Sequence, residues 1–65
     1  MKSIFHAYYN GDCYEIHVRD MHFVKIIKHS SGSGLIREVD FAHLNQAIQE
    51  TIIDAFTDFL IQKQP

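Results

Sequence analysis

Residues 4–19, IFHAYYNGDCYEIHVR, decide how this chain begins to fold. Asn10-Gly11 separates two runs, residues 4–9 and 13–19, that are rich in aromatic and β-branched side chains. Asn and Gly tolerate the positive φ that both central positions of a type I′ turn require. The stretch therefore predicts an antiparallel β-hairpin with a two-residue turn at Asn10-Gly11.

A turn of this length also predicts which residues face each other across the hairpin. It sets Phe5 against Ile16 on an apolar face, whereas a slip of one residue would set Phe5 against His17 and mix the two faces. The apolar face also receives the pairs Ser3 with Val18, Ala7 with Tyr14, and Tyr9 with Asp12. The other, mostly polar face receives Lys2 with Arg19, Ile4 with His17, His6 with Glu15, and Tyr8 with Cys13.

A third strand is expected over residues 22–29, HFVKIIKH, but both of its faces carry apolar residues, so the pattern leaves its register open. A three-residue loop at 20–22 would place Val24 and Ile26 on the apolar face of the hairpin. Phe23 and Ile27 would then lie on the second face, which would be only half polar.

A short fourth strand is expected over residues 35–39, LIREV, after a flexible loop at 30–34, SSGSG. Its simplest position is antiparallel beside the third strand. If residues 35–39 are not a strand, the sheet has three strands.

The C-terminal part of the chain predicts one helix from about residue 41 to residue 62, with Asp40 as its N-cap. The residues expected to face the sheet recur at three- and four-residue spacing: Phe41, Leu44, Ile48, Ile52, Ala55, Phe56 and Phe59. Packing them on the apolar face of the meander gives a single α+β domain over residues 1–65, with the order β-β-β-β-α.

Composition bounds the classes of partner and compartment. The 65 residues carry a net charge of −2, so the chain lacks the overall basic charge typical of proteins that bind nucleic acid or anionic lipid. Protonation of the five histidines would reverse that sign. A lone Cys13 cannot form an intramolecular disulfide, and we find neither a signal peptide nor a membrane span, so the expected location is the cytoplasm.

An acidic ridge, formed by Glu50, Asp54 and Asp58, is expected on the helix surface opposite the apolar stripe. Like charges four residues apart weaken an isolated helix by a few tenths of a kcal/mol per pair. Acidic rows are usually solvated surface, but this one is our candidate contact surface for a basic protein partner, including a protein that normally grips phosphates.

The second half of the helix has an apolar sector that one small sheet would not fully cover, and Ile61 adds an apolar position on the far side. An uncovered apolar sector is typical of an interface, so the sequence predicts a homodimer, although a wide core-facing helix is nearly as good an interpretation. The residues predicted at the dimer interface are Ile53, Phe56, Phe59 and Leu60.

Four side chains that can ligate metal gather on the polar face of the hairpin: His6, Cys13, Glu15 and His17. Neighbours on a sheet lie about 5–8 Å apart at Cβ, so they could converge on one ion or form a thiolate–imidazole pair. The C-x-E-x-H spacing belongs to no known metal site, however, and scattered histidines on a solvated face are common. We predict no metal, no cofactor and no catalysis here.

Tyrosines and basic residues on the sheet suggest a further alternative, a surface that stacks single-stranded nucleic acid. The register places Tyr9 and Tyr14 on the apolar face, which leaves only Tyr8 to stack, and residues 1–40 have no net charge. Nucleic acid is therefore an unlikely partner.

The function predicted from the sequence is a non-enzymatic protein–protein interaction module, a small regulator or inhibitor that binds a macromolecular partner. No motif identifies that partner. A chain of this length also has the size of accessory proteins of phages and other mobile elements, which is a hypothesis from size alone.

Overall fold

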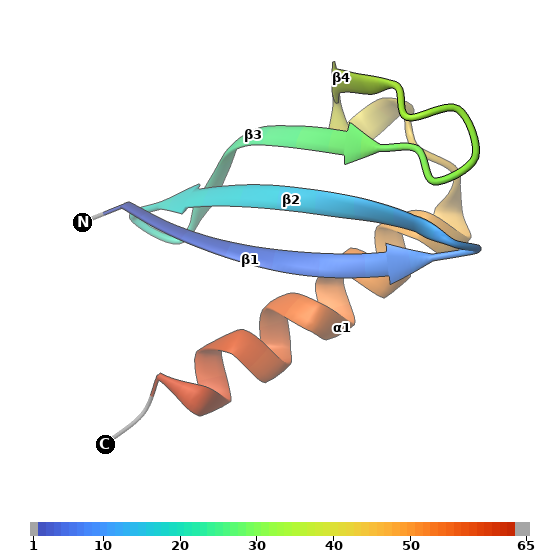
Figure 1. Ribbon diagram of the computed structural model, residues 1–65. Helices are drawn as coiled ribbons and strands as arrows, with labels where there is room; N and C mark the ends of the chain where they lie inside the picture. Colours follow the sequence, from blue (N-terminus) through green and yellow to red (C-terminus); the bar gives the residue numbers. More distant parts are fainter. Residues whose placement is uncertain (1, 64–65) are drawn as a thin grey trace.

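In the computed structural model, four strands and one long helix form two layers (Figure 1). The structure describes the backbone of residues 2–63 and the side chains of residues 3–63. The strands pair in the order β1-β2-β3-β4, and every neighbouring pair is antiparallel. The elements are β1 (Lys2–Tyr9), β2 (Asp12–Arg19), β3 (His22–His29), β4 (Ile36–Val39), the 3₁₀ turn η1 (Phe41–His43) and α1 (Gln46–Gln62). The predicted α+β meander with one C-terminal helix is confirmed.

The first hairpin has the predicted turn and register. Asn10 and Gly11 have φ values of 54° and 88°, as a type I′ turn requires. Phe5 faces Ile16, and all eight predicted cross-strand pairs are present. Phe5 and Ile16 are buried, so the face predicted to be apolar is the face that forms the core.

The second turn has two residues rather than the expected three. Asp20 and Met21 both have positive φ, 52° and 68°, and Met21 is an unusual residue in that conformation. The ladder then shifts, so that Val18 faces Phe23 while His17 faces Lys25. Such a bulge adds one residue to a strand, which here is β3.

The bulge decides which residues of β3 reach the core. Val24 is 53% exposed, which corrects its predicted place on the apolar face. Phe23 packs against the core, which corrects its predicted place on the second face. Ile26 faces Ile16 in the core and Ile27 faces Glu15 on the second face, as the three-residue loop implied.

The helix begins later than predicted, at Gln46 rather than residue 41. Asp40 makes no side-chain capping bond, and Leu44 and Asn45 have extended backbones that separate η1 from α1. Asn45 is the N-cap, since its side-chain oxygen accepts a hydrogen bond of 2.9 Å from the backbone N–H of Ile48. The predicted N-cap, Asp40, is therefore wrong for this helix.

The core lies between the sheet and α1, which packs mainly against β1 (Figure 1). Ile16 and Ile52 have no exposed surface. Phe5 stacks with Phe56 and Phe59 at centroid distances of 5.5 and 5.4 Å. All seven residues predicted to face the sheet lie in or against the core, although two of them, Phe41 and Leu44, precede α1: Phe41, Leu44, Ile48, Ile52, Ala55, Phe56 and Phe59. In residues 2–63, α1 covers the first face of the sheet and no other α-helix lies over the second face (Figure 1).

Candidate functional site

The acidic ridge lies on the outer surface of α1, where Glu50, Asp54 and Asp58 are all exposed. Gln46 donates a hydrogen bond of 3.0 Å from Nε2 to Glu50 Oε2. Within residues 3–63, no ion pair joins a basic side chain to any of the three carboxylates. Their negative charges are therefore not neutralised within this part of the chain.

The residues of the acidic ridge border two separate shallow hollows. Glu50 and Asp54 border the first, which has a volume of about 540 Å³. Its other lining residues are Phe41, Gln46, Gln49 and Ile53. Asp58 instead borders a second hollow of about 350 Å³, between α1 and the edge of β1.

The first hollow combines apolar surface with negative charge. Phe41 comes from η1 and Ile53 from α1, and Ile53 is 49% exposed. Gln49 donates a hydrogen bond of 2.8 Å from Nε2 to the backbone carbonyl of Phe41, which ties the start of α1 to η1. Sequence reasoning missed this hollow because Phe41 was expected inside the helix, whereas a separate 3₁₀ turn carries it.

The four residues predicted at the dimer interface differ in their exposure. Phe56 and Phe59 are half-buried and stack on Phe5 in the chain's own core. Leu60 is half-buried as well, and Ile53 is the exposed member of the set. The aromatic cluster therefore accounts for part of the wide apolar sector, while Ile53 and the 60% exposed Ile61 stay on the outside of α1.

The polar face of the hairpin contains a cluster made by Glu15, His17 and His29. His17 Nε2 lies 2.6 Å from Glu15 Oε2, and His29 Nε2 lies 3.2 Å from Glu15 Oε1. Hydrogen bonds from His17 and then from His29 lower the pKa of the Glu15 carboxyl, whereas its desolvation acts in the opposite direction. The His17 ring is 12% exposed, and its Nδ1 has no hydrogen-bond partner within the described residues.

This cluster differs from the metal-ligating set considered from the sequence. His6 faces Glu15 across the hairpin as predicted, but the carboxylate bonds to His17 and His29 instead. Cys13 faces His29 on β3, but the side chains of these two described residues form no hydrogen bond with each other. Over residues 3–63, no three His, Cys, Asp or Glu side chains lie in an arrangement that could hold a metal ion.

His29 was missed, although a signal for it existed. The three-residue loop considered for the second turn implies the pairing of His17 with Lys25, and the same register carries His29 to a position opposite Cys13. The bulge changes only the pairs nearest the turn, so this inference was available from the sequence.

The tyrosines lie where the hairpin register predicted. Tyr14 is 1% exposed in the core and Tyr9 packs against it, so neither offers a free ring to a nucleic-acid base. Tyr8 is 66% exposed on the second face of the sheet. One exposed ring provides little of the stacking surface that single-strand binding requires.

Comparisons with known proteins assign no family to the chain: no protein-family model matches it, and neither a curated protein nor a solved structure gives a significant match. No helix in residues 2–63 is long and apolar enough to cross a membrane. The surfaces described above therefore have to be interpreted from their own chemistry.

Proposed function

We propose that the chain is a non-enzymatic protein-binding module, a small regulator or inhibitor whose helix surface binds a basic segment of a partner protein. The observation that carries this proposal is the hollow bordered by Glu50 and Asp54. In this hollow the two carboxylates lie beside the apolar surface of Phe41 and Ile53. Neither carboxylate forms an ion pair within the described residues.

A lysine or arginine side chain suits this combination of surfaces. Its methylene stem would pack on Phe41 and Ile53, and its charged head would reach Glu50 and Asp54. Asp54 lies four residues from both Glu50 and Asp58, so the ridge presents a continuous negative row to a basic segment. Complementary charge of this kind gives specificity and speeds association more than it raises affinity.

The reducing cytoplasm is the compartment proposed for this activity. Cys13 is the chain's one cysteine and is a free thiol in the structure. The fold is held together without a disulfide, which suits a reducing environment.

Selection of random peptides on the immobilised chain tests the proposal. Selected peptides should be enriched in Lys or Arg next to apolar residues. They should bind the double variant Glu50→Gln/Asp54→Asn about tenfold more weakly, mainly through slower association, because both carboxylates of the hollow are then neutral. Glu38→Gln on β4 is the matched control and should bind as the parent does. Neutral or acidic selected peptides, or equal binding by the double variant, would contradict the proposal.

The predicted homodimer stays a prediction, and a second copy is the competing occupant of the helix surface. Sedimentation at several concentrations distinguishes the two cases. A chain that dimerises, and that becomes monomeric with Ile53→Asp while remaining folded, would assign the surface to a second copy instead of a basic partner.

A further inference from the structure

The first strand forms one edge of the sheet and has backbone groups with no partner in the sheet. β1 pairs with β2 alone and is eight residues long. Tyr9 and Asp12 flank a two-residue turn, so they form a hydrogen-bonded pair, and such pairs alternate along an antiparallel ladder. The backbone N–H and C=O groups of Ile4, His6 and Tyr8 therefore point away from β2, toward the free edge.

Nothing in the described residues occupies this edge. No backbone hydrogen bond outside the sheet uses Ile4, His6 or Tyr8. The hollow of about 350 Å³ lies directly beside the strand, between Ile4 and His6 on one side and α1 on the other. A strand added to the sheet would lie about 4.8 Å from β1, along this hollow.

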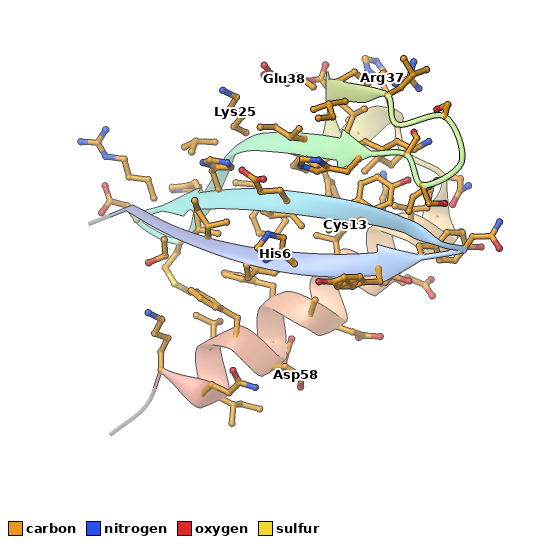
Figure 2. The ribbon with its side chains drawn as sticks, viewed as in Figure 1. His6, Cys13, Lys25, Arg37, Glu38 and Asp58 are labelled. Atoms are coloured by element: carbon orange, nitrogen blue, oxygen red, sulfur yellow. The ribbon has the colours of Figure 1, made fainter. Side chains whose placement is uncertain are left out.

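The opposite edge of the sheet is protected in ways that β1 is not. β4 has only four residues, and two of them, Arg37 and Glu38, are charged and exposed (Figure 2). Short length and charge are common means by which proteins keep edge strands from pairing with other chains. Of the four residues of β1 with outward backbone groups, only Lys2, the first residue of the strand, carries a charge, and Ile4, His6 and Tyr8 in its middle and end are neither charged nor proline. The two edges therefore differ in their readiness to accept a further strand.

We propose that the free edge of β1 binds an extended, basic peptide segment as a fifth strand of the sheet. This inference rests on the proposed function, since it gives the partner's segment a conformation and a place beside the ridge. Main-chain hydrogen bonds would supply affinity and alternate side chains would supply specificity.

The α1 side of the hollow indicates which side chains the added strand carries. Ala55 and Phe59 offer apolar surface. Asp58, which Figure 2 shows on α1, offers a carboxylate. Asp58 has no ion pair with a described basic side chain. Strand residues that point toward α1 should therefore be basic or apolar.

A second copy of the chain fits this edge poorly. Antiparallel pairing of two β1 strands places both helices on the same side of the joined sheet. Because α1 packs mainly against β1, the edge strand, the two helices would crowd each other at the joint, where packed helices need about 8–10 Å between their axes. A segment without a helix of its own meets no such obstacle, so a peptide is the occupant.

The test uses a capped heptapeptide of alternating lysine and valine, with binding followed by amide NMR signals and hydrogen exchange. The amides of Ile4, His6 and Tyr8 should become protected from exchange when the peptide binds. The same peptide with N-methyl groups on alternate residues keeps its charge but cannot form the ladder, so it should bind at least tenfold more weakly. A glutamate–valine peptide should bind at least tenfold more weakly too, because it repels Asp58.

Two variants at one position separate the backbone from the side chain. His6→Pro removes an N–H that faces the free edge, a position where sheets tolerate proline, and should weaken binding at least tenfold. His6→Ala keeps the backbone N–H, so it is the matched comparison and should bind at least tenfold more tightly than His6→Pro. If His6→Pro does not fold, the N-methylated peptide still decides the question.

Several results would overturn the inference. These are absence of binding at millimolar peptide, equal binding of the N-methylated peptide, or protection of the three amides that rises with protein concentration alone, which would indicate pairing of two copies. Peptide binding that depends on Glu50 and Asp54 but not on the His6 backbone would contradict only the added strand. It would still support the proposed function.

Discussion

The face of the sheet that packs on α1, the inner face, and the second face, the outer face, are built from alternate residues of the same strands. The two faces have opposite environments. On β1, Phe5 and Ala7 are 5% and 3% exposed, while their neighbours Ile4 and Tyr8 are 45% and 66% exposed. Successive side chains of a strand point to opposite faces, and α1 covers one of these faces. A short chain can thus use one face of its sheet for stability while the other face stays exposed.

The largest expected difference between the two faces is in how much a truncation to alanine lowers the free energy of unfolding. Ile16→Ala should lower the free energy of unfolding by about 3 kcal/mol, because Ile16 has no exposed surface and truncation leaves a cavity. Ile4→Ala on the outer face should change it by less than about 0.5 kcal/mol. Urea unfolding of both variants measures the difference. Similar losses would mean that the outer face is also covered, for example by a second copy.

A smaller effect concerns the charge cluster on the outer face. The lowered pKa of Glu15 means that its carboxylate stabilises the fold at neutral pH, above the pKa of the unfolded chain. This contribution should be lost as pH falls through the lowered pKa of the folded state. Glu15→Gln should therefore flatten the acid side of the stability–pH curve.

The matched control for this experiment is Glu38→Gln. Glu38 lies on the same row of the sheet, opposite Ile27, which itself faces Glu15. Denaturant unfolding between neutral pH and pH 3 should give the control the parent's curve. A Glu15→Gln curve with the parent's slope would show that the two imidazoles do not stabilise the carboxylate.

Local chemistry predicted the parts of the fold that depend on neighbouring residues. Asn10-Gly11 has the residue types that positive φ favours, and the first hairpin followed from them. Asp20-Met21 adopts a similar turn, but Met gives no such signal, so the bulge and the positions of Phe23 and Val24 could not be derived.

The candidate site depended more on tertiary structure. The exposure of the acidic ridge followed from the helical spacing of its residues. The hollow beside Glu50 did not, because it depends on Phe41 leaving the helix at η1, and Asp40 and Asn45 are equally good capping residues by type. Identification of the free edge of β1 depends on the strand order and on the position of α1 against β1. The sequence predicted the strand order but not the position of α1.

The central claim is that the exposed charge of α1 serves recognition more than folding. The most direct test is the salt dependence of binding for a selected basic peptide, measured on the parent and on the triple variant Glu50→Gln/Asp54→Asn/Asp58→Asn. The triple variant should be as stable as the parent or slightly more stable, because like charges at four-residue spacing are removed. Its binding should weaken and lose most of its response to salt. Binding of the same strength with the same salt response would show that the ridge is solvated surface and would contradict the account.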